Sequence, residues 1–125
     1  MEERVIERLR SLGYPEVSSS DRALVLCILR KVEQGIRNYC NLAEIPEELE
    51  VTVVENTCGE FLMMKKLSGE VLGFDLEACV SSLSEGDTSV SFDVSMTPEK
   101  RLDSVIGYLT AYGRDGLNRF RKVVW

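Results

Sequence analysis

The sequence predicts a mainly α fold, a small helical bundle with an extended loop or β-hairpin between the third and the last long helix. In four segments, apolar residues recur at the three- and four-residue spacing that places them on one face of a helix. That spacing is lost between residues 67 and 97. The chain has 125 residues, of which 44% are apolar, and this is enough for the core of one domain.

The first helix is expected over residues 1–12, because Gly13 is a typical helix-ending residue. Ser18 and Asp21 then approximate a capping box, so a second helix is expected over residues 21–39. Apolar residues fill positions 23–29 without a polar face, and this start of the second helix is expected to be surrounded by protein.

The third helix is expected over residues 46–66, with Pro46 in its first turn. A short link separates it from the second helix, which favours an antiparallel pair. The last long helix is expected over residues 98–112, since Thr97 is a good N-cap residue and Pro98 suits the first helical position.

A β-hairpin is expected over residues 81–94, where polar and apolar residues alternate at a period of two. Its turn is placed at Glu85, Gly86, Asp87 and Thr88. Two strands alone are barely stable in water, so the hairpin must pack on the helices or on another subunit.

The composition excludes several kinds of chemistry. The chain has no histidine, which excludes Ser–His and Cys–His catalytic pairs and any histidine metal ligand. Its cysteines are spaced unlike a zinc site and are expected to be free and mostly buried thiols: Cys27, Cys40, Cys58 and Cys79. No phosphate-binding or calcium-binding motif occurs. The expectation is a chain that is not an enzyme and binds no cofactor or metal.

The first ten residues are highly charged and predict no secretory signal, and no apolar run is long enough to span a membrane. A reducing cytoplasm is therefore the expected compartment.

Charge is unevenly distributed along the chain, whose net charge is −6. Residues 1–46 have seven acids and seven bases, residues 47–97 have eleven acids and two bases, and residues 98–125 have three acids and six bases. An acidic middle and a basic end can attract each other within a monomer or between subunits.

The basic C-terminal segment includes two aromatic residues. It provides the second set of candidate contacts, after the hairpin turn: Arg119, Phe120, Arg121, Lys122 and Trp125. These residues can contact phosphate, or they can contact protein, with the aromatic rings docked on a core.

Eight segments along nearly the whole chain form an ordered signature. They are Val17–Asp21, Lys31–Glu33, Asn38–Asn41 with Ile45–Leu49, Cys58–Leu62, Gly73–Ala78, Ser84–Thr88 and Arg119–Lys122. In this order they resemble the head–tail connector (adaptor, or DNA-packaging) proteins of long-tailed phages and of prophages in Gram-positive bacteria.

The resemblance implies a helical subunit that forms a homo-oligomeric ring under the portal protein. Such a ring extends the DNA channel, lets DNA pass without specific binding, and is a platform for the next head-completion or tail protein. The implied location is the virion, and the host cytoplasm during assembly. No catalytic residue is implied. The alternative function is a small prophage protein that regulates or binds nucleic acid.

Overall fold

The computed structural model describes residues 1–14, 16–68 and 97–122. Four α-helices make up most of this part, α1 (Glu2–Ser11), α2 (Ser19–Cys40), α3 (Glu50–Leu67) and α5 (Pro98–Ala111). Two 3₁₀ helices, η1 (Glu47–Leu49) and η2 (Arg114–Phe120), precede α3 and follow α5. The prediction of a mainly α bundle is confirmed. The predicted hairpin over residues 81–94 lies outside the described residues.

Local signals set the helix ends. The capping box of α2 is confirmed, since the Ser18 hydroxyl accepts a hydrogen bond from the Asp21 amide at 3.1 Å and the Asp21 carboxylate accepts one from the Ser18 amide at 3.2 Å. The Thr97 hydroxyl caps α5 in the same way, by accepting a bond from the Lys100 amide at 3.3 Å. Each cap satisfies an amide that the first turn leaves without a helical partner.

The third helix differs from its predicted start at residue 46. Pro46 is extended, and the Leu49 amide donates to the Pro46 carbonyl at 3.0 Å, so the chain first makes a 3₁₀ turn. The α-helix begins at Glu50. Proline at this position favours the start of a helix. The first turn, however, has the three-residue hydrogen-bond spacing of a 3₁₀ helix, and the four-residue spacing of the α-helix follows it along the chain.

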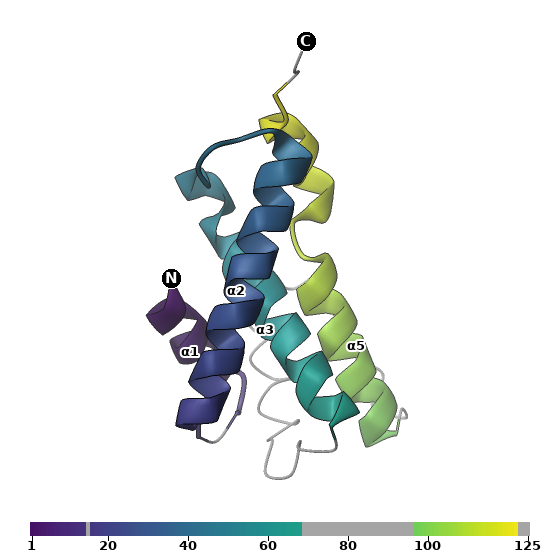
Figure 1. The fold of residues 1–125 in the computed structure, drawn as a ribbon. Helices are drawn as coiled ribbons and strands as arrows, with labels where there is room; N and C mark the ends of the chain where they lie inside the picture. The colour runs from purple at the N-terminus through teal and green to yellow at the C-terminus, as the bar shows by residue number, and fades with distance from the viewer. Residues whose placement is uncertain (15, 69–96, 123–125) are drawn as a thin grey trace.

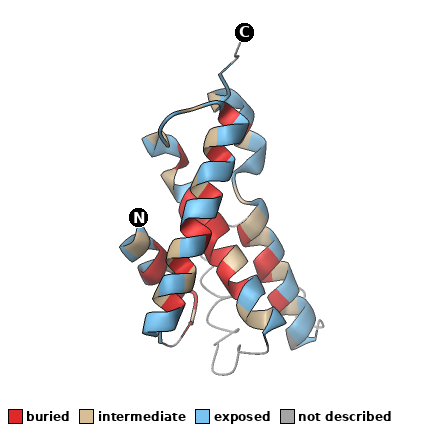
Figure 2. Cartoon of the chain, viewed as in Figure 1, coloured by how far each residue is buried: buried red, intermediate tan, exposed pale blue. Residues whose placement is uncertain are grey.

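Helix α3 is the centre of the bundle and contacts α1, α2 and α5 (Figure 1). Its chain direction is opposite to that of α2 and of α5, as predicted for the α2–α3 pair. Two ion pairs at different positions along the helices join α2 to α3, Asp21 with Lys65 and Lys31 with Glu60. Figure 2 shows the buried residues of the helices facing this shared interior.

The start of the second helix is less buried than the sequence predicts. Cys27 and Ala23 are exposed, and Leu24 and Leu26 are only half-buried. Instead, the segment surrounded by protein is Thr52–Gly59 of α3, all of which is buried. The reason is position, because α3 has neighbours on three sides whereas α2 lies at the edge of the layer that α2, α3 and α5 form.

Polar residues in the middle of α3 are buried together with specific partners. The Asn56 amide group donates to the Leu109 and Tyr112 carbonyls at 2.9 and 3.0 Å, which ties α3 to the last turn of α5. Glu55 accepts from Arg8 of α1. Buried polar groups that find partners in this way specify how the helices pack.

Gly59 lies where α3 and α5 pack closely together. A Cβ atom there would be 2.8 Å from the Leu109 Cβ and from the Thr110 backbone nitrogen. We expect Gly59→Ala to destabilise the fold by about 1–3 kcal/mol, because the backbone of α5 must move to admit the methyl group. Urea denaturation measures this.

Gly35 is the matched control, since it also lies inside a helix but has nothing within 4 Å of its added Cβ. Gly35→Ala is expected to stabilise by up to about 1 kcal/mol through helix propensity alone. Equal stabilisation by both substitutions would show that the α3–α5 crossing is not as close as described.

Candidate functional site

The candidate site that the structure describes is the end of the bundle where α2 finishes and η2 packs. We call Arg114, Arg119, Arg121 and Lys122 the basic end. Gly113 adopts a left-handed conformation with φ of 71°, which ends α5 and turns the chain into η2. Leu117 of η2 is buried in the core, so its neighbours are held at the surface of this end.

Hydrogen bonds fasten this segment to the C-terminus of α2. The Lys122 amide donates to the Cys40 carbonyl at 2.8 Å, and the Asn41 side chain donates to the Lys122 carbonyl at 2.8 Å. The Tyr39 hydroxyl bonds to the Asn118 side chain. The basic end is therefore part of the folded structure, and it also places cations where the dipole of α2 favours them.

The aromatic residues of this end support the guanidinium groups. The Arg121 guanidinium lies 5.2 Å from the centre of the Tyr39 ring, and that of Arg119 lies 5.8 Å from the Phe120 ring, both within the range of cation–π attraction. Phe120 itself is half-buried and packs against the core, so its ring is largely an anchor within the subunit.

The cations of the basic end have no carboxylate within ion-pair distance in the described part of the chain. Most basic residues of the helical body, in contrast, are ion-paired: Arg4, Arg8, Arg22, Lys31, Arg37, Lys65 and Lys66. Four exposed cations that have no carboxylate partner among the described residues are suited to binding an acidic surface or a phosphate.

Of the residues predicted as contacts, the structure brings Arg119, Phe120, Arg121 and Lys122 together. The predicted hairpin turn (Glu85, Gly86, Asp87 and Thr88) and Trp125 lie outside the described residues. Sequence reasoning missed Arg114 and Tyr39 as members of this end. No local pattern joins Tyr39 to Arg121, and their contact depends on η2 folding back onto α2.

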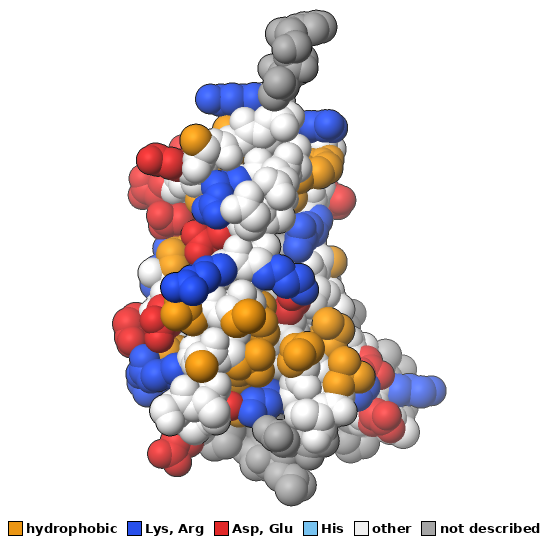
Figure 3. Space-filling model, in the orientation of Figure 1, with side chains coloured by type: hydrophobic (Ala, Val, Ile, Leu, Met, Phe, Trp, Pro, Cys, Tyr) orange, Lys and Arg blue, Asp and Glu red, His pale blue; other side chains and the backbone are white. Residues whose placement is uncertain are grey.

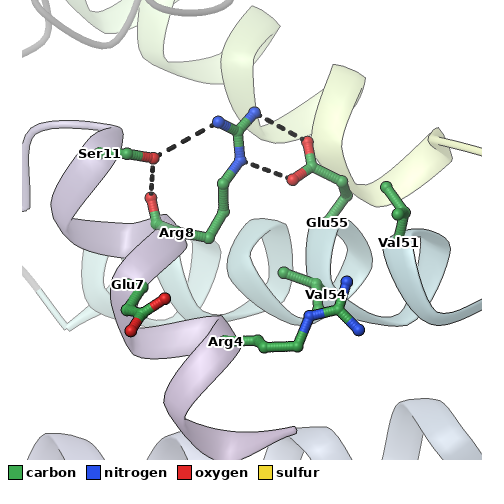
Figure 4. Close-up of a pocket in the computed structure, with 7 residues that line it drawn as sticks. All are labelled: Arg4, Glu7, Arg8, Ser11, Val51, Val54 and Glu55. Atoms are coloured by element: carbon green, nitrogen blue, oxygen red, sulfur yellow. Dashed lines mark hydrogen bonds and ion pairs between the residues drawn. The ribbon is translucent and has the colours of Figure 1, made fainter.

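A hollow lies between α1 and α3, has a volume of about 350 Å³, and is shown in Figure 4. Arg8 forms a two-point ion pair with Glu55 across it, at 2.6 and 3.1 Å. The Ser11 hydroxyl donates to the Arg8 carbonyl at 2.7 Å. The charges thus join two helices and the hydroxyl is bonded within α1, which is a structural arrangement rather than an activated nucleophile.

An apolar surface covers part of α2 and α3. Figure 3 shows hydrophobic side chains gathered in the lower half of the face that it draws. Met63, Met64 and Leu67 of α3 are exposed, Leu67 to 78%, and Leu24 and Cys27 of α2 are half-buried and exposed. Leu24 and Cys27 belong to the segment 23–29, which was expected to be surrounded by protein, and they contribute to this surface because that segment is only partly buried.

The described cysteines are free, as predicted, but only two of the three are buried, Cys40 and Cys58. Burial raises the pKa of the Cys40 thiol, although nearby Arg121 acts in the opposite direction. The prediction of a buried thiol is wrong for Cys27, which lies on the exposed side of α2. Cys79 lies outside the described residues.

Comparison with family models, with curated proteins and with solved structures finds no match to this chain. Within residues 1–14, 16–68 and 97–122, no acidic and cysteine side chains gather in a way that would hold a metal ion. None of the helices in those ranges has both the length and the apolar character to cross a membrane.

Proposed function

We propose that this chain is a structural subunit of a phage virion, a head–tail connector that forms a ring under the portal protein. Its copies extend the DNA channel and offer a platform for the next head-completion or tail protein. DNA passes through without specific binding, and the chain is not an enzyme. It acts in the virion, and in the host cytoplasm during assembly.

The observation that carries this proposal is the basic end, a set of cations fixed on the folded bundle without carboxylate partners in the described part. A subunit that joins other proteins needs a surface with a defined shape and a complementary charge. The ordered resemblance along the chain and the helical bundle both support the same function.

The test of this proposal is a triple substitution, Arg119→Ala with Arg121→Ala and Lys122→Ala. We expect docking on the portal ring to be lost or weakened about tenfold or more, because truncating charges at an interface slows association and weakens binding. Folding should be nearly unchanged, since exposed charges contribute little to stability. Co-sedimentation with the portal ring measures docking, and circular dichroism measures folding.

The matched control replaces three exposed bases outside the basic end by Ala: Arg10, Arg30 and Lys100. It removes the same charge and should dock normally. Normal docking of the basic-end variant, together with loss of DNA binding in a low-salt retardation assay, would favour the alternative, a regulatory or nucleic-acid-binding protein.

A further inference from the structure

An acidic corner is a further cluster of charged groups that have no ion-pair partner in the part of the chain that the structure describes. Glu44, Glu47 and Glu48 are all exposed, on the loop before η1 and on η1 itself. No cation of the described residues is within ion-pair distance of them. Their neighbour Glu50, by contrast, pairs with Arg4 at 2.7 Å.

The acidic corner and the basic end lie at the same end of the bundle. Figure 1 shows η1 on one side of the C-terminal end of α2 and η2 on the other. Both are anchored by burial, η1 through Leu49 and η2 through Leu117. Each set of charges is therefore fixed at a separate flank and has no ion-pair partner among residues 1–14, 16–68 and 97–122.

We propose that these two flanks bind each other between copies, so that the acidic corner of one subunit contacts the basic end of the next. The four bases of the basic end and their neighbour Asp115 have a net charge of +3, against −3 for the three carboxylates of the corner, so the charges cancel. The contact is between two copies, and each copy contributes a different surface to it. Repetition of such a contact generates a ring or a filament. The inference deepens the proposed function, on which it relies for closure into a ring.

The composition of the basic flank fits a protein partner. Tyr39 is 43% exposed and lies beneath Arg121. Tyrosine and arginine are enriched at the centre of protein interfaces, whereas carboxylates at a rim steer the encounter. The contact depends on charge and must therefore weaken as ionic strength rises.

The experiment uses two charge reversals in the full chain. The base reversal is Arg119→Glu, Arg121→Glu and Lys122→Glu, and the acid reversal is Glu44→Lys, Glu47→Lys and Glu48→Lys. Association is measured at low salt by sedimentation velocity. A carbodiimide then joins lysines directly to carboxylates, and a mixture of ¹⁴N- and ¹⁵N-labelled chains identifies the links that form between copies.

We expect the wild-type chain to associate and to form a link between Lys122 of one copy and a corner glutamate of another. Each reversal alone should lose this association. An equimolar mixture of the two reversals should regain it, because the basic corner of one variant then faces the acidic end of the other. The control Arg10→Glu, Arg30→Glu and Lys100→Glu changes the net charge as the base reversal does and should associate like wild type.

Three outcomes would overturn the inference: no association of the wild-type chain, association of either single reversal at the level of the control, or a mixture that does not regain it. Failure of the proposed function gives a different result. A wild-type chain that associates through this contact but does not dock on the portal retains the contact and rejects the connector function. An acid reversal that docks on the portal, together with a mixture that does not regain association, rejects the contact and leaves the connector function in place.

Discussion

Phe61→Ala is expected to destabilise the protein by about 3–5 kcal/mol, the usual cost of emptying a large aromatic site in a core. Phe61 is completely buried in α3, and its ring meets the Tyr14 ring edge-on, with the centres 5.2 Å apart. The Lys65 ammonium lies 5.8 Å from the same ring centre. Removing the ring therefore takes away contacts to the segment after α1 as well as to the core.

Urea denaturation followed by circular dichroism measures the loss. Phe61→Leu is the matched control and should cost less, because leucine keeps most of the apolar volume. An unchanged free energy of unfolding for Phe61→Ala would show that this face of α3 is not packed in the core.

Asp21→Asn is expected to have the second large effect, a loss of about 3–5 kcal/mol near neutral pH. Asp21 is buried, and its carboxylate lies 2.6 Å from the Lys65 ammonium. It also accepts a hydrogen bond from the Tyr14 hydroxyl at 2.9 Å. Asparagine keeps the shape but removes the Asp21 carboxylate charge from beside the Lys65 ammonium, whose side chain is 12% exposed.

The effect of Asp21→Asn depends on pH. Burial by itself would raise the pKa of Asp21, but hydrogen bonds from Lys65, the Ser18 amide and Tyr14 outweigh it, so the pKa lies below its ordinary value of 3.8. The carboxylate therefore contributes its stability above about pH 4, and this contribution is lost as pH falls through the lowered pKa. The difference between wild type and Asp21→Asn should shrink in acid.

A double variant separates the charge from the packing. Adding Lys65→Met to Asp21→Asn removes the remaining charge and should recover part of the lost stability, since an apolar pair of similar size often replaces a buried ion pair at little cost. A stability difference that stays constant from pH 7 to pH 3 would contradict the ion-pair explanation.

Features of the fold that depend on neighbouring residues were predictable from the sequence. The capping box of α2 is set by residues three positions apart, and Thr97 caps α5 for the same reason. The position of a helix in the bundle is different, because it depends on contacts between distant segments. An apolar run at residues 23–29 does not indicate which of its sides another helix covers, and Cys27 is consequently exposed.

The candidate site was predictable only in part. The basic residues at positions 119–122 stand out in the sequence by charge. Their fixed position does not, because it is made by bonds from Asn41 and Cys40, which lie about eighty residues earlier. Glu47 and Glu48 are the acids expected at a helix start. Only the fold reveals that they lie on the flank of α2 opposite the basic end.

The most direct test of the connector function is electron microscopy of the purified chain mixed with the portal ring encoded in the same phage or prophage genome. The account predicts an added ring of copies on the outer face of the portal, continuous with its channel, and weaker decoration as salt increases. A bare portal ring at high concentrations of the chain in low salt, with the chain bound instead to DNA, would contradict it.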